Sequence, residues 1–160
     1  MKTKYLLLVL IILGGISLST GCVFSKKNTF IKDIKRFNFY YSTGNYIYGN
    51  ISYAIELKDG KYILKIKPDG KSEEEATIIK IDDQVIEGLI NILNKYNVKS
   101  WNGFKKSDPN VLDGNSFSMS ITEKDDSNIS ASGYMMWPNN YHEVKDELNT
   151  LFNNIYKEKE

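Results

Sequence analysis

Alternation of apolar and polar side chains between residues 37 and 57 constrains the fold more than any other feature of the sequence. The positions of one parity are Phe37, Phe39, Tyr41, Ile47, Gly49, Ile51, Tyr53, Ile55 and Leu57. Because successive side chains of a β-strand point to opposite faces, this period of two predicts strands with one buried and one exposed face. Asp59-Gly60 follows, and Asp-Gly between two alternating runs favours a tight hairpin, since both residues tolerate positive φ. We therefore expect a β-meander over residues 34–81.

Two amphipathic helices are predicted after the meander. Asp82 and Asp83 are suited to cap the first helix, because carboxylates accept the free N–H groups of a helix start, and Asn97 suits a left-handed end. The apolar residues of this helix recur at helical spacing: Val85, Ile86, Leu89, Ile90, Leu93 and Tyr96. The second helix is expected to start at Pro138-Asn139, and its apolar stripe consists of Tyr141, Val144, Leu148, Leu151, Phe152 and Ile155.

Between these helices the sequence predicts a loop over residues 100–115 and two strands over residues 116–123 and 128–136. The resulting order is ββββ-α-ββ-α. Short turns between strands favour antiparallel pairing, and two amphipathic helices can cover one face of such a sheet. We therefore predict a single α+β domain over residues 33–160, with an antiparallel sheet of about six strands and both helices packed on one face.

The first 22 residues have the features of an export signal. Lys2 and Lys4 precede an apolar run over residues 5–13, which is short for the roughly 20 residues of a bilayer span. Small residues, Thr20 and Gly21, then precede Cys22. This segment resembles the bacterial lipoprotein signal, or lipobox, although Ser19 stands where leucine is usual. The alternatives are an ordinary secretory signal with an incidental cysteine, and an uncleaved membrane anchor.

The lipobox resemblance implies cleavage between Gly21 and Cys22, with acylation of the Cys22 thiol. Residues 1–21 would then be a signal peptide and residues 22–32 a lipidated tether. It also implies an exported protein that is anchored to the extracytoplasmic face of a bacterial membrane. Cys22 is the only cysteine, so no disulfide framework competes for it. Basic residues follow it, and they are expected either to contact anionic headgroups or to be solvated: Lys26, Lys27, Lys32, Lys35 and Arg36.

Composition argues against a nucleic-acid partner. Without Lys2 and Lys4, 19 of the 21 basic residues remain against 20 acidic ones, so the mature chain has a formal charge near −1. Arg36 is the only arginine, and arginine is the residue preferred for bidentate phosphate and base contacts.

Four aromatic residues, Trp101, Phe104, Tyr134 and Trp137, gather in the C-terminal half of the chain. They are candidate binding residues, since aromatics offer large contact areas to a glycan, peptide or lipid. The alternative is that they pack where the helix ends meet the sheet. The half that contains them is similar to small bacterial exported lipoproteins with no assigned activity, and this likeness implies a fold without implying a function.

The motifs of the common enzymes and metal sites do not occur. His142 is the only histidine, and no Gly-x-Ser-x-Gly sequence accompanies it. With Cys22 acylated, too few ligands remain for zinc. Asp108, Asn110, Asp113 and Asn115 suggest calcium but lack the EF-hand spacing, and turn chemistry explains them better. We therefore predict no catalytic residue, no cofactor and no metal.

The sequence thus predicts a lipid-anchored, non-catalytic binding domain whose partner is a protein or an envelope polymer, bound through a sheet face or through residues 101–138. One alternative is an inhibitor or immunity-type lipoprotein that blocks a secreted toxin or hydrolase by inserting loop carboxylates into a basic cleft. Another is a hydrolase that uses two carboxylates, for which Asp108, Asp113 and His142 are the residues to test.

Overall fold

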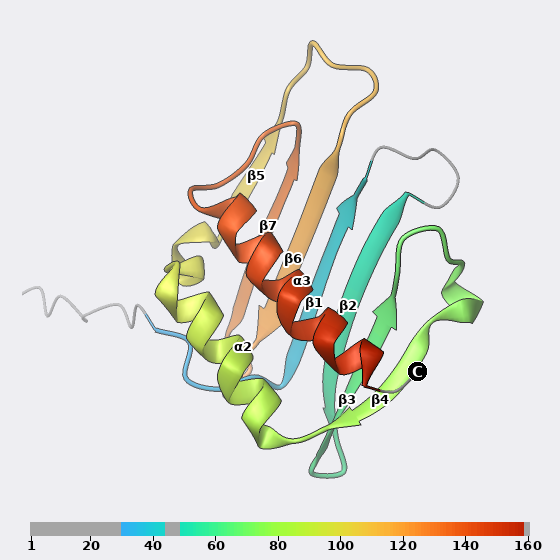
Figure 1. Cartoon of the computed structure of the whole chain (residues 1–160). Coiled ribbons are helices and arrows are strands. Elements are labelled where there is room, and N and C mark those ends of the chain that lie inside the picture. The colour runs from blue at the N-terminus through green and yellow to red at the C-terminus, as the bar shows by residue number, and fades with distance from the viewer. Residues whose placement is uncertain (1–29, 44–48, 159–160) are drawn as a thin grey trace, which may run out of the picture.

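The structure, a computed structural model, describes residues 30–43 and 49–158. In these residues seven strands form one sheet, and two helices pack on one of its faces (Figure 1). The strands are β1 (Arg36–Ser42), β2 (Asn50–Lys58), β3 (Lys61–Lys67), β4 (Thr77–Ile81), β5 (Phe104–Ser107), β6 (Ser116–Thr122) and β7 (Asn128–Tyr134). The helices are α2 (Asp83–Lys95) and α3 (Tyr141–Lys157), with 3-10 turns η1 (Glu73–Glu75) and η2 (Val98–Trp101). The predicted α+β class is confirmed.

The sheet differs from the prediction in having a mixed pairing and an additional strand. Its order is β4-β3-β2-β1-β6-β7-β5, and β5 pairs with β7 in parallel while the other neighbours are antiparallel. The element order is therefore ββββ-α-βββ-α. Strand β5 lies inside the predicted loop over residues 100–115. Its sequence, Phe-Lys-Lys-Ser, has one partly buried side chain and no apolar alternation, so no period-two signal was present.

Several local signals of the sequence are confirmed. Asp59 and Gly60 have φ of 51° and 72°, as the two-residue hairpin between β2 and β3 requires. Asp82 caps α2 by accepting a hydrogen bond from the Val85 amide at 3.1 Å. Asn97 is left-handed, with φ of 51°. The last helix begins later than predicted, at Tyr141, because the backbone of Asn140 is left-handed, with φ of 61°.

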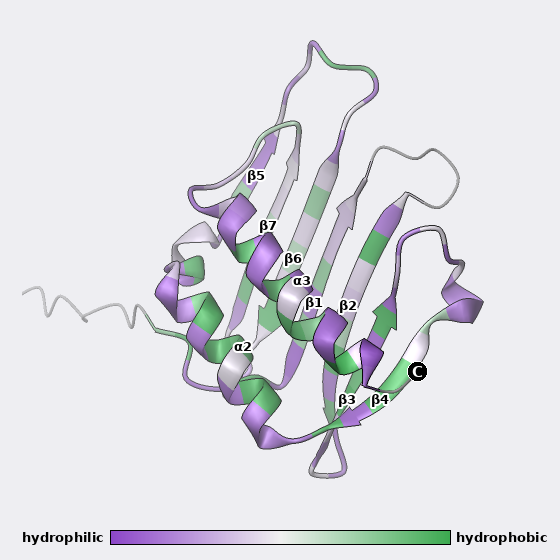
Figure 2. Cartoon of the chain, viewed as in Figure 1, coloured by the Kyte–Doolittle hydropathy of each residue, from purple (hydrophilic) through white to green (hydrophobic). Residues whose placement is uncertain are grey.

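The alternating residues form the core between the sheet and the helices. From the sheet, Phe37, Phe39, Tyr53, Ile55 and Leu64 are buried, and from the helices Leu89, Leu93, Val144, Leu148 and Phe152. The ring of Phe152 lies 4.6 Å from that of Tyr53 between ring centroids. Figure 2 shows hydrophilic residues on the turns of α3 that point away from the sheet. The helices thus cover one face, and we call the opposite one the open face.

The chain enters the described domain at the end of the sheet where β1 starts (Figure 1). Ile31 and Ile34 are buried, and the backbone of Ile31 exchanges two hydrogen bonds of 2.8 Å with the Asn94 side chain. Ile31 and Lys32, the last residues of the predicted tether, are therefore attached to the domain, while Cys22 lies outside the described residues. Lys35 pairs with Asp126 at 2.6 Å and Arg36 with Glu56 at 3.4 Å.

Candidate functional site

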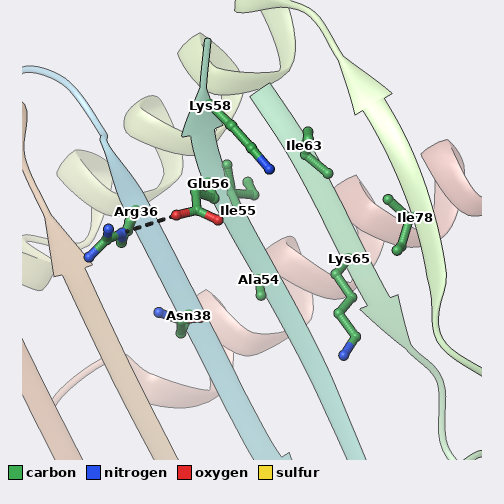
Figure 3. A pocket seen from close by; sticks show the side chains of 9 residues that line it. All are labelled: Arg36, Asn38, Ala54, Ile55, Glu56, Lys58, Ile63, Lys65 and Ile78. Carbon is green, nitrogen blue, oxygen red and sulfur yellow. Dashed lines mark ion pairs between the residues drawn. The ribbon is translucent and has the colours of Figure 1, made fainter. Parts of the chain in front are cut away.

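A shallow hollow of about 390 Å³ lies on the open face of the sheet, across strands β1 to β4 (Figure 3). We call it the hollow, and its lining consists of Arg36, Asn38, Ala54, Ile55, Glu56, Lys58, Ile63, Lys65 and Ile78. Ile55 is buried in the core, on the other side of β2 from its neighbours Ala54 and Glu56. The remaining eight residues have the parity that faces away from α2 and α3.

The hollow exists because a small residue lies among long ones. The strand register places Asn38 opposite Ala54, Ala54 opposite Lys65, and Lys65 opposite Ile78, so these residues form a row across the sheet. The next row contains Arg36, Glu56 and Ile63. Opposing side chains in adjacent strands lie about 5 Å apart, so the longer residues form walls around the short side chain of Ala54.

The lining is positively charged. Three cations, Arg36, Lys58 and Lys65, stand against one carboxylate, Glu56, which gives a formal charge of +2. Lys65 also pairs with Glu73 of η1 at 3.0 Å, and Arg36 pairs with Glu56. Both pairs are more than one-third exposed, and exposed pairs contribute at most about 1 kcal/mol to stability. These cations are therefore available to exchange their partners for a ligand's carboxylates at little cost.

Apolar side chains complete the hollow. Ala54, Ile63 and Ile78 lie at positions that face solvent, and Ile78 is 70 % exposed on edge strand β4. An open apolar surface surrounded by cations suits a partner that presents apolar and acidic groups together. The sequence predicted a sheet face as one of two possible binding surfaces, but it identified none of the residues that line this hollow as binding residues. The signal available in the sequence was that all three residues are apolar at the strand positions where the alternation calls for polar ones.

The four aromatic residues predicted as a binding group do not share one surface. Trp101 is 3 % exposed and donates a hydrogen bond from Nε1 to the Asn139 carbonyl at 3.1 Å. Trp137 stacks on Tyr141 with 4.6 Å between ring centroids, and Phe104 packs near the core. These three lie on the helix side of the sheet. Tyr134 has the open-face parity, and its hydroxyl donates to the Leu112 carbonyl at 2.7 Å.

The residues weighed for hydrolysis or calcium lie in separate local structures. His142 is exposed in the first turn of α3, with its ring 5.2 Å from that of Tyr141. Asp108 accepts a hydrogen bond from the Asn110 amide at 2.9 Å, in a turn, and Asp113 is exposed. Within residues 30–43 and 49–158, no group of three or more His, Cys, Asp or Glu side chains is placed to hold a metal ion.

The fold and the hollow define an α+β domain with a mixed sheet that is covered by helices on one face and open on the other. No known family model matches the chain, and no curated protein is significantly similar to it in sequence. None of the described helices has the length and hydrophobicity that crossing a membrane requires.

Proposed function

We propose that this protein is an exported, lipid-anchored and non-catalytic binding domain, held at the extracytoplasmic face of a membrane through Cys22, whose open face binds a partner protein. The observation that carries the proposal is the hollow. It combines the exposed Ile78 and the partly buried Ile63 with a +2 lining on a face that no described helix covers. The partner it fits is a protein segment with apolar and acidic side chains.

The shape of the hollow favours a protein partner over a small ligand. Ligand pockets usually enclose most of their ligand, whereas this hollow is open to solvent and spans four neighbouring strands. The Ile78 side chain at its rim is an apolar contact of the kind that anchors interfaces. Anchoring is supported by the leader sequence, in which a charged start, a short apolar run and small residues precede Cys22.

The test is a crosslinking pull-down from intact cells that express the full anchored chain. Two variants should abolish enrichment of the partner: Ala54→Phe, which fills the hollow, and Lys65→Glu, which reverses a charge of its wall. The matched control is Ser118→Phe, because Ser118 is exposed on the same face in β6, outside the hollow. The proposal fails if no protein is enriched by the wild type, or if the hollow variants and Ser118→Phe retain the same proteins.

A further inference from the structure

An exposed apolar residue stands at the end of the sheet opposite to the start of β1, in the loop between β5 and β6 (residues 108–115, the β5–β6 loop; Figure 1). Leu112 is 93 % exposed, and Figure 2 shows hydrophobic colouring in this part of the loop. Met135, which is 38 % exposed, and Val111 lie next to Gly114 of the same loop: a Cβ on Gly114 would be 2.3 Å from Met135 Cγ and 3.2 Å from Val111 Cγ1. The loop therefore presents one strongly exposed apolar side chain, Leu112, which we call the knob.

Hydrogen bonds to β7 hold this loop in place. The Asp108 amide donates to the Tyr134 carbonyl at 3.0 Å, and the Tyr134 hydroxyl donates to the Leu112 carbonyl at 2.7 Å. The Met135 amide donates to the Asn115 carbonyl at 2.9 Å. A loop that is already ordered loses little conformational entropy when it binds, so the exposed Leu112 is preorganised for contact.

The charge of the β5–β6 loop is opposite in sign to the charge of the residues that line the hollow. Residues 108–115 contain Asp108 and Asp113 and no lysine or arginine, which gives a formal charge of −2. The lining of the hollow carries +2 around Ala54, Ile63 and Ile78. The knob and the hollow are thus both apolar at their centres, and the charged side chains around them have opposite signs. Such charge complementarity fixes the register and the choice of partner.

A molecule cannot place this loop in its own hollow. The loop joins β5 to β6, which lie four and two strands from β2, so about 10 to 19 Å of sheet separates its two ends from the strand that carries Ala54, at about 4.8 Å per strand. The loop also extends beyond the far end of the strands (Figure 1). We propose that the β5–β6 loop of one molecule binds the hollow of a second copy of this chain. This inference rests on the proposed function, since it uses the same hollow and names the partner.

Such a contact is heterologous, because the two surfaces that meet are different. Each copy offers one knob and one hollow, so a head-to-tail contact continues from copy to copy and either closes into a ring or extends into an open chain. One leucine and two carboxylates make a small interface, which is weak between freely diffusing molecules. Attachment of the copies to one membrane raises their effective concentration, as linkage does for any weak pair of sites.

Introduced cysteines test the contact in the full anchored chain, because Cys22 is the only native cysteine. A chain with both Leu112→Cys and Ala54→Cys, treated in cells with a mild oxidant, should give a ladder of disulfide-linked species beyond the dimer. Chains with either substitution alone have one introduced thiol and should give nothing larger than a disulfide-linked dimer. Larger species from these chains would show that Cys22 also forms disulfides. Moving the first cysteine to the opposite end of the sheet, with Lys61→Cys in place of Leu112→Cys, is the matched control.

Charge reversal gives the second readout. Lys65→Glu should reduce the ladder about tenfold by opposing like charges, and Asp113→Lys in the same chain should restore it. Self-association is overturned if the ladder is absent, if Lys61→Cys produces it equally well, or if Lys65→Glu leaves it unchanged. Adducts of Leu112→Cys with a different protein overturn it as well. Enrichment of another partner that Ala54→Phe abolishes, without a ladder, leaves the binding function standing and removes only the second copy as its partner.

Discussion

The hydroxyl of Tyr53 on β2 donates a hydrogen bond to Asn149 Oδ1 on α3 at 2.8 Å, within the otherwise apolar layer between helix and sheet. The Tyr41 hydroxyl on β1 donates to the same oxygen, also at 2.8 Å. Both tyrosines are buried, so a single amide satisfies two hydroxyls that would otherwise be removed from water without an acceptor. This shared acceptor fixes the position of α3 over the two strands that form half of the hollow.

Asn149→Ala should therefore lower the free energy of unfolding by about 2 kcal/mol, because two buried hydroxyls lose their acceptor. Tyr41→Phe and Tyr53→Phe should each lower the free energy of unfolding by less than Asn149→Ala does, since Asn149 Oδ1 still accepts a hydrogen bond from the other tyrosine. Urea denaturation measures all three. Asn153→Ala is the control, because Asn153 is exposed on the same helix. An Asn149→Ala variant as stable as Asn153→Ala would contradict this account of the network.

Alkaline conditions should destabilise the domain through the same region. Burial raises the pKa of Tyr41, Tyr53 and Tyr141 above the usual tyrosine value. A raised pKa means that the folded state keeps protons that the unfolded state releases, so this stability is complete below about pH 10 and is lost as pH rises further. Urea unfolding between neutral and alkaline pH measures the loss. Tyr53→Phe should make the alkaline decline less steep, and an unchanged decline would exclude Tyr53 as a contributor.

The stability of the domain at acidic pH should depend on Glu123, which is 4 % exposed. Glu123 lies next to the segment through which the chain enters the domain. Burial alone would raise the pKa of Glu123. The Lys99 ammonium at 2.5 Å, the Lys32 amide at 3.0 Å and the Ser127 hydroxyl at 3.1 Å outweigh it and hold the pKa below its usual range. The stabilisation is thus complete above about pH 4.3 and is lost as pH falls through the lowered pKa.

Glu123→Gln tests this carboxylate. It should lower the free energy of unfolding at neutral pH by about 2 kcal/mol, because Lys99 loses its counter-charge in a partly buried site. It should also flatten the decline in stability as the solution is acidified. Urea unfolding at several pH values measures both effects. Glu143→Gln is the control, because Glu143 is exposed on α3. Identical acid profiles for wild type and Glu123→Gln would refute the assignment.

Local patterns were sufficient to predict most of the fold. The alternation that includes Phe37, Phe39 and Tyr53 predicted their burial, since the parity of a strand depends only on its own residues. The cap at Asp82 and the left-handed turn at Asp59-Gly60 are equally local. Strand β5 was not predictable in this way, because backbone pairing with β7 holds it and its side chains carry no pattern.

The hollow required information that no single strand contains. The apolar residues Ala54, Ile63 and Ile78 each depart from the alternation in their own strand. Their grouping depends on the register across β2, β3 and β4. Likewise, Arg36 meets Glu56 because β1 and β2 are neighbours in this register, 20 positions apart along the chain. Sequence could therefore indicate which residues were unusual, but their arrangement around Ala54 came from the pairing of the strands.

The anchor itself gives the last prediction. Labelled palmitate should enter the full chain in cells, and Cys22→Ser should abolish the label, because Cys22 is the only thiol in the sequence. Ser25→Ala, three residues further along, should keep the label and serve as the control. The wild-type protein should lack residues 1–21 by mass spectrometry and fractionate with membranes, whereas Cys22→Ser should lose lipid-dependent membrane attachment. Label that persists in Cys22→Ser would refute lipidation at Cys22, and an unlabelled wild-type protein released into the medium would indicate an ordinary secretory signal.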